Sequence, residues 1–177
     1  MIAKYFTDIS NVYGYAIASG IKQKGLDLAF IYVPTAVACA AVFTQHKFKA
    51  SSVTYTQKCV KQHVLKAVVI NSGNANAVTG VQGERDTKEI AQLVAKLLDL
   101  SPKEVGVSAT GIIGQPLPMD KLRAQLPTLL SNPHKRSGKD VANAILTTDL
   151  VEKTVWIEKK IGKKTIVIAG ITKGSGM

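Results

Sequence analysis

Near its C-terminus the chain reads Thr165-Ile-Val-Ile-Ala-Gly-Ile-Thr-Lys-Gly-Ser-Gly-Met177. The apolar first part of this stretch predicts a buried β-strand. The glycines after Lys173 predict a loop of the kind that approaches a ligand or another backbone closely. Folded chains usually end in a polar, dispensable tail. We therefore expect one half of a larger protein here, in preference to the alternative of a frayed terminus.

The residues just before this stretch predict a β-hairpin. Val155-Trp-Ile157 and Thr165–Ile168 flank Lys159-Lys-Ile-Gly-Lys-Lys164, which is typical of a glycine-containing turn with lysines on a solvated tip. Across the chain, strand-like runs occur at Asp27–Val33, Ala36–Phe43, Lys66–Asn71, Glu104–Ala109, Lys153–Glu158 and Lys164–Gly170. Several runs are continuously apolar, which predicts strands covered on both faces, or on one face with a partner chain on the other.

Apolar residues at helical spacing predict three helices, over Arg85–Leu100, Met119–Leu130 and Ser137–Leu146. Asp86 with Glu89 resembles a capping box, and Ser137 is a candidate N-cap. Strands come in adjacent pairs at both ends of the chain, which disfavours a plain doubly wound fold. The sequence therefore predicts an α/β fold, mixed α+β, in a single domain.

Composition indicates an ordinary globular protein, with 177 residues, 46% of them hydrophobic and 20% charged. No apolar run reaches the roughly 18 residues needed to cross a bilayer, and the N-terminus lacks the layout of a secretory signal. The two cysteines make no disulfide framework, and the histidines lack metal-ligand spacing. Cys39 is expected as an inert thiol in a buried strand. We expect a cytoplasmic protein with no membrane contact and no metal.

The net charge of +11 raises the question of nucleic-acid binding. The lysines are dispersed, however, and neither an aromatic RNA-binding signature nor a recognition-helix motif is present. We expect no nucleic-acid partner. An acidic partner chain, or substrates that carry carboxylates, account better for the charge.

The familiar catalytic signatures are missing from the sequence. It contains no Gly-x-Ser-x-Gly elbow, no phosphate-binding loop and no dinucleotide fingerprint. No serine or cysteine has an obvious base beside it. If the chain is half of an enzyme, its nucleophile lies elsewhere.

Three loops rich in glycine and hydroxyl groups follow predicted strands or helices. The first, Asn71–Gly80, is explained mainly as an Asx-turn loop, with a polar pocket floor near Asn74 and Asn76 as the functional alternative. In the second, Ser108–Gly114, Thr110 and Gly111 could supply two oxyanion donors, although spacing alone favours a structural turn. The third, Leu146–Asp149, could equally cap a helix or bind a small polar ligand.

Together these loops resemble the bifunctional ornithine acetyltransferase / glutamate N-acetyltransferase family of arginine biosynthesis, over essentially the whole chain. The matching segments are Gly20-Ile-Lys22, Ala41-Val-Phe-Thr44, Asn71-Ser-Gly-Asn-Ala-Asn-Ala77, Ala109-Thr-Gly-Ile-Ile-Gly114, Leu117-Pro-Met119, Ile145-Leu-Thr-Thr-Asp149 and Ala169–Met177. The asparagine-rich loop and the Lys-Gly-Ser-Gly-Met end are the specific ones. Val78 departs from the family, which often has cysteine there.

The resemblance implies a precursor that cuts itself before a threonine, shortly after Met177. Residues 1–177 would then be the α chain, with layered helices and a mixed sheet completed by a β chain, in an α2β2 heterotetramer. The new N-terminal threonine would be the nucleophile, since its own α-amine can serve as the base. The architecture would be of the ornithine acetyltransferase or N-terminal-nucleophile aminopeptidase type.

Site residues follow from the same resemblance. Thr110 and Gly111 match the oxyanion hole, whereas Thr147 and Lys173 match substrate contacts, with Thr148 as a further pocket candidate. Lys173 would pair with a substrate carboxylate. The implied reaction is ping-pong transfer of acetyl from N2-acetylornithine to glutamate, without a cofactor and with acetyl-CoA as an alternative donor. The rival interpretations are a self-cleaving aminopeptidase or amidase half, and a basic binding module without catalysis.

Overall fold

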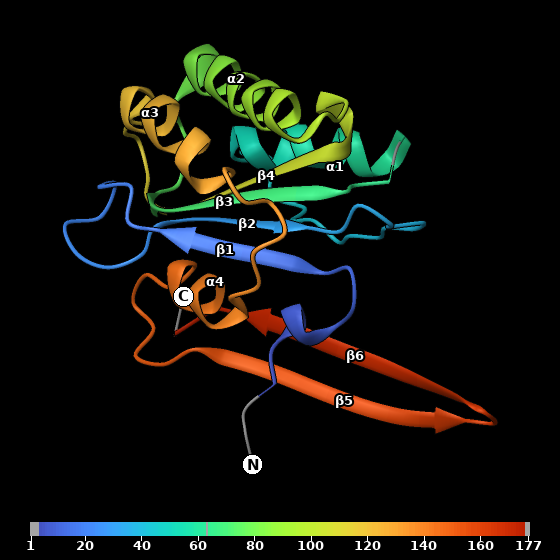
Figure 1. Cartoon of the computed structure of the whole chain (residues 1–177). Coiled ribbons are helices and arrows are strands. Elements are labelled where there is room, and N and C mark those ends of the chain that lie inside the picture. Colours follow the sequence, from blue (N-terminus) through green and yellow to red (C-terminus); the bar gives the residue numbers. More distant parts are fainter. Residues whose placement is uncertain (1–3, 63, 176–177) are drawn as a thin grey trace.

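The computed structural model describes residues 4–62 and 64–175, so the last two residues of the C-terminal stretch lie outside it. Its elements are stacked in layers (Figure 1). Helices α1 (Ser51–Gln62), α2 (Gly80–Leu98) and α3 (Met119–Leu129) cover one face of a four-stranded sheet. Helix α4 (Gly138–Ala144) lies on the other face, between that sheet and a separate two-stranded hairpin. Two short 3-10 turns, Phe6–Asp8 and Pro102–Glu104, complete the described elements.

The larger sheet is mixed, as the resemblance to the family implies. Its strands are β1 (Tyr13–Ile17), β2 (Leu28–Tyr32), β3 (Ala67–Asn74) and β4 (Val105–Ile112), in that spatial order. The first two pairings are antiparallel and the β3–β4 pairing is parallel. Parallel neighbours need a long crossover, which α2 supplies. The carboxyl ends of β3 and β4 therefore meet at one edge of the sheet.

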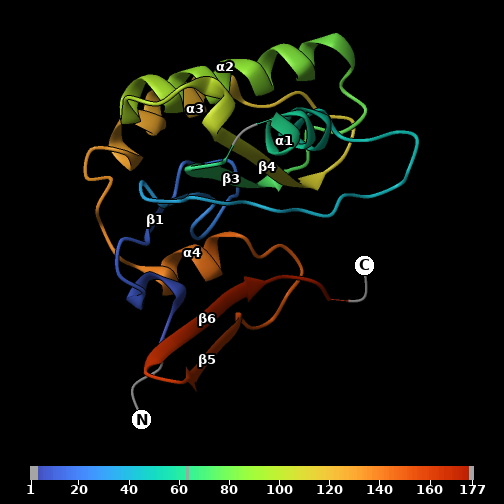
Figure 2. The ribbon, with the colours of Figure 1, turned by 90° about the vertical axis from the view of Figure 1, so that its right-hand side faces the viewer.

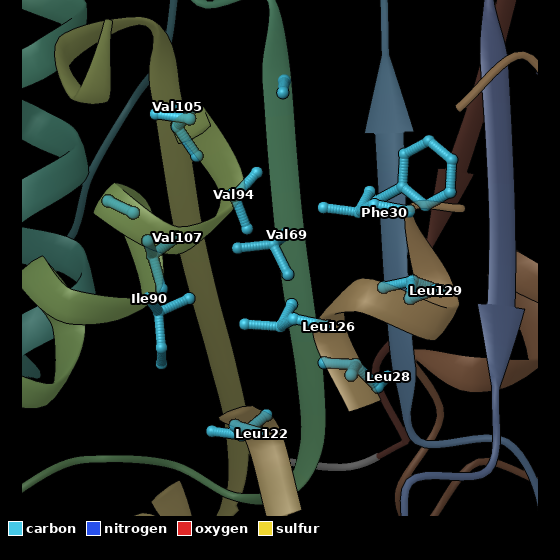
Figure 3. Packing of buried hydrophobic residues seen from close by; sticks show 14 of the residues in the cluster. Leu28, Phe30, Val69, Ile90, Val94, Val105, Val107, Leu122, Leu126 and Leu129 are labelled. Atoms are coloured by element: carbon cyan, nitrogen blue, oxygen red, sulfur yellow. The ribbon is translucent and has the colours of Figure 1, made fainter. Parts of the chain in front are cut away.

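The main core lies between this sheet and the helices above it. Figure 3 shows side chains of α2 and α3 pointing toward those of β2, β3 and β4. Ile90 and Val94 come from α2, and Leu122 and Leu126 come from α3, in agreement with the predicted apolar stripes. A second, smaller cluster packs α4 against the other face of the sheet and against the hairpin.

The C-terminal hairpin is confirmed, but its strands are not buried. Strands β5 (Lys153–Ile161) and β6 (Lys164–Thr172) pair antiparallel, with Gly162 at φ 60° in the turn. Most of β6 is exposed. The prediction of a buried strand is therefore wrong for this chain by itself, because the hairpin has one face against the second cluster and the other in solvent.

The predicted strand at Ala36–Phe43 is wrong. This segment is irregular, and Val37 and Val42 are 91% and 100% exposed. A strand needs a hydrogen-bonded neighbour, and none of the described strands pairs with this segment. Cys39 is consequently half-buried instead of lying in a core strand.

Two elements escaped prediction, and one cap is misplaced. Helix α1 is largely polar, and β1 is short and contains a glycine, so their local patterns are weak.

Helix α2 begins at Gly80, five residues before its predicted start, which places Asp86 inside the helix. Its buried carboxylate there accepts a hydrogen bond from Gln82 and caps nothing. Ser137 does precede α4, although its hydroxyl binds Asp140 and no backbone N–H.

Candidate active site at the carboxyl ends of β3 and β4

The predicted oxyanion turn lies where β3 and β4 end side by side. Gly73 pairs with Gly111, next to a bulge at Asn74. Gly111 has φ +134°, and a Cβ atom there would lie 2.3 Å from the carbonyl carbon of Gly73. Only glycine fits such a close approach of two backbones. The contact fixes the position of Thr110, the residue before it.

One ammonium group brings together three of the predicted site residues. Lys173 Nζ donates a hydrogen bond to Thr110 Oγ1 at 2.9 Å and another to Thr147 Oγ1 at 2.8 Å. The contacts span 63 and 26 residues of sequence. Thr147 rather than Thr148 enters the cluster; Thr148 is exposed, and its side chain makes no hydrogen bond within the described residues.

The hydrogen bonds from Lys173 orient the hydroxyl protons. Each threonine oxygen accepts from the ammonium, so its own proton is free to be donated to another oxygen. Within residues 4–62 and 64–175, no carboxylate lies within 4.0 Å of Lys173 Nζ. The half-exposed cluster thus presents positive charge and polarised hydroxyls, which suits an oxygen that gains negative charge.

Asp149 connects the two loops that carry Thr147 and Lys173. Its side chain is completely buried, and its Oδ1 accepts from Lys153 Nζ at 2.6 Å and from the backbone N–H of Gly174 at 2.7 Å. These hydrogen bonds lower the pKa of Asp149 to about 2, so it is ionised at neutral pH. The sequence shows Asp149 only as an acidic residue that follows Thr147 and Thr148, and it does not predict its contact with Gly174.

A second ammonium lies behind Thr147. Lys22 Nζ donates to the carbonyl of Leu146 at 3.2 Å. Burial lowers the pKa of Lys22, the charge of Asp27 opposes this shift, and the charge of Lys173 adds to it. No local pattern singles Lys22 out as a site residue, because Leu146, whose carbonyl it binds, is 124 positions away.

Comparisons with known proteins identify the family of this chain. The model of the ArgJ family matches residues 14–177. The chain belongs to the ArgJ family. It is 44% identical over 163 residues to the arginine biosynthesis bifunctional protein ArgJ of Gloeobacter violaceus, a match that covers 91% of this chain and 40% of that protein. The corresponding protein of Caldanaerobacter subterraneus is 40% identical over 161 residues, with the same coverage of both chains.

Solved structures of this family share the fold. The ArgJ crystal structure from Bacillus halodurans superposes with a TM-score of 0.92 at 33% identity, covering 98% of this chain and 92% of that one. Ornithine acetyltransferase from Mycobacterium tuberculosis, solved in complex with ornithine, superposes with a TM-score of 0.92 at 36% identity. The match covers 100% of this chain and 95% of that one. The predicted family and the mixed α+β class are confirmed.

In the asparagine-rich loop of this ArgJ-family chain, the side-chain amides of Asn74 and Asn76 form hydrogen bonds within the protein. Asn74 donates to the carbonyls of Gln115 and Pro116, and its Oδ1 accepts the N–H of Asn76. Asn76 is fully buried, with its amide bound to Gly83 and Thr87. These contacts support the structural explanation of the loop, which holds β3 against the start of α2. They offer no free amide to a pocket.

Other features of the described residues lie apart from this cluster. An open cavity of about 580 Å³ is lined by residues near Phe48 and Val78, away from Thr110 and Lys173. Within the described ranges, no group of three or more His, Cys, Asp or Glu is placed to hold a metal. Nor does any described helix combine the length and apolar character needed to cross a membrane.

Proposed function

We propose that this chain is the α chain of an acetyltransferase that moves the acetyl group from N2-acetylornithine to glutamate, with acetyl-CoA as an alternative donor. One observation carries the proposal: Thr110 and Thr147 converge on the ammonium of Lys173 beside Gly111. An acyl transfer needs donors at the position where a carbonyl oxygen becomes an oxyanion. The choice of acetyl and ornithine is supported by the structural neighbour from Mycobacterium tuberculosis, an ornithine acetyltransferase solved with ornithine.

In the proposed mechanism, the nucleophile is the N-terminal threonine of a β chain. Its hydroxyl attacks the acetyl carbon, and the oxyanion is stabilised by the Thr110 hydroxyl and the Gly111 N–H. The C–N bond then breaks, and ornithine leaves with the proton on its amine. The amine of glutamate attacks the acetyl-threonine ester, which releases N-acetylglutamate and restores the hydroxyl. Thr147 and Lys173 contact the substrate, the latter through a carboxylate.

Two observations support a second chain. The chain spans only 40% of the length of the curated relatives, whereas it covers over nine-tenths of each solved chain. The solved family members therefore contain a chain of similar size to this one. We propose that it is paired with a β chain in a cytoplasmic α2β2 assembly.

The outer face of the hairpin offers a surface for that partner. Five aliphatic side chains lie on this face of β5 and β6, each about half exposed: Val155, Ile157, Ile161, Ile166 and Ile168. Figure 2 shows the hairpin at the edge of the molecule, beyond α4. A two-stranded sheet is only marginally stable by itself in water, so a covering chain would stabilise it.

Assay of acetyl transfer separates this proposal from its closest rival. We expect the assembled protein to release ornithine from N2-acetylornithine at a rate that depends on glutamate, with N-acetylglutamate formed in equal amount. Omission of glutamate serves as the control. An aminopeptidase or amidase would instead release ornithine and acetate at the same rate without glutamate.

Intact-mass analysis tests the proposed cleavage. Expression of the full-length gene should yield this chain together with a larger second chain whose first residue is threonine. Replacing that threonine with alanine should leave one uncut precursor, because the attacking hydroxyl is gone. A single uncut product from the unaltered gene, active in acetyl transfer, would contradict the split-chain mechanism.

A further inference from the structure

The backbone of Lys22 is fixed by a buried carboxylate. Asp27 is fully buried, and its Oδ2 accepts the N–H of Lys22 at 2.8 Å. Its other oxygen accepts the N–H and the hydroxyl of Ser19, at 2.6 and 2.8 Å. The loop between β1 and β2 is thereby held against the start of β2. The backbone of Lys22, from which its side chain extends, is therefore fixed in position.

The stem of Lys22 then crosses the end of β3. A Cβ atom placed on Gly73 would lie 2.9 Å from Lys22 Cγ, so the lysine stem rests on that glycine. Gly73 is the residue that Gly111 contacts from β4. Lys22 thus packs on Gly73, which is one of the two glycines that set the oxyanion turn.

The ammonium of Lys22 ends at the peptide bond that precedes Thr147. It donates to the Leu146 carbonyl at 3.2 Å, beyond the end of α4. No carboxylate lies within 4.0 Å of Lys22 Nζ among the described residues. Lysine side chains in water are seldom held this way without a carboxylate, because ordering the long stem costs conformational entropy. The fixed backbone and the packed stem reduce that cost here.

From this geometry we infer that Lys22 is a positioning residue of the site: its ammonium holds the Leu146–Thr147 peptide so that the Thr147 hydroxyl stays within reach of Lys173 and the substrate. The inference rests on the proposed function for the identity of the substrate. Lys22 touches no reacting atom in this arrangement. It acts through Thr147.

Lys22→Met in the complete, assembled protein tests the inference. A charge-assisted hydrogen bond is worth roughly 1.5–3 kcal/mol, or about a ten- to hundredfold effect. We expect KM for N2-acetylornithine and for glutamate to rise by about that factor, with kcat changed less than threefold. Lys24→Met is the matched control, because Lys24 is an exposed lysine in the same loop. Lys22→Gln, which keeps a polar but shorter group, replaces the methionine variant if that one does not fold.

A double-mutant cycle distinguishes positioning from a general structural role. If Lys22 acts through Thr147, adding Lys22→Met to Thr147→Val should cause little further loss. Losses that multiply, or single-variant kinetics within twofold of Lys24→Met, would overturn the inference. Calorimetric titration with ornithine gives a second readout: weakened binding in Lys22→Met supports the inference even if the wild-type protein transfers no acetyl group. A wild-type protein that neither binds ornithine nor transfers acetyl overturns the proposed function, and the inference with it.

Discussion

We expect Thr110→Val to lower turnover of the assembled protein by about 100- to 1000-fold, the usual loss when one oxyanion donor is removed, because we propose that role for the Thr110 hydroxyl. Valine keeps the shape of threonine but has no hydroxyl. The loss should appear in kcat, since the donor acts on charge that exists only in the transition state. Steady-state acetyl transfer from N2-acetylornithine to glutamate measures it.

Two variants serve as controls for this prediction. Thr110→Ser keeps the hydroxyl that accepts from Lys173 and should retain most of the turnover. Thr128→Val alters an exposed threonine on α3 that is not bound to Lys173, and it should have no effect. A Thr110→Val enzyme within threefold of wild type would remove this hydroxyl from the mechanism.

Gly111→Ala should destabilise the protein by roughly 2–6 kcal/mol, because it combines a strained backbone angle with overpacking. At φ +134° an L-residue is strained, and the added methyl would collide with the backbone of Gly73 at 2.3 Å. Backbone atoms cannot yield as a flexible side chain would. The free energy of unfolding in urea, measured on the assembled protein, reports the loss. Activity should fall with it, since β3 and β4 must separate.

Gly114→Ala is the matched control for that change. Gly114 also has a positive φ, of +82°, but a Cβ atom there would meet nothing within 4 Å. Its cost should be the backbone strain alone, about 1–3 kcal/mol. Equal losses in the two variants would show that the contact with Gly73 is not the cause.

Much of the fold is predictable from the sequence, where local pattern and tertiary packing agree. The helices over Arg85–Leu100 and Met119–Leu130 appear as α2 and α3 because their apolar residues recur on one face. The C-terminal hairpin appears because two β-rich runs flank a glycine turn. The segment Ala36–Phe43 has an apolar pattern but forms no strand, because a strand needs a neighbour that supplies hydrogen bonds.

Some residues of the candidate site are predictable from the sequence, but their arrangement is not. Resemblance to the family points to Thr110, Thr147 and Lys173, and these three do meet. Its matching segments include Lys22 and Asp149, but it predicts neither the contact of Lys22 with Leu146 nor that of Asp149 with Gly174. Both contacts join segments that no local pattern connects.

By itself, the sequence determined the family, the mixed α+β class and the helices and strands whose apolar periodicity is strong. That information is local, because a side chain's face in a helix or strand depends on its near neighbours. Only the tertiary structure decided that Lys173 bridges Thr110 and Thr147, with Lys22 behind them. These contacts depend on the parallel pairing of β3 with β4 and on how α4 and the hairpin pack beneath the sheet, and both are long-range.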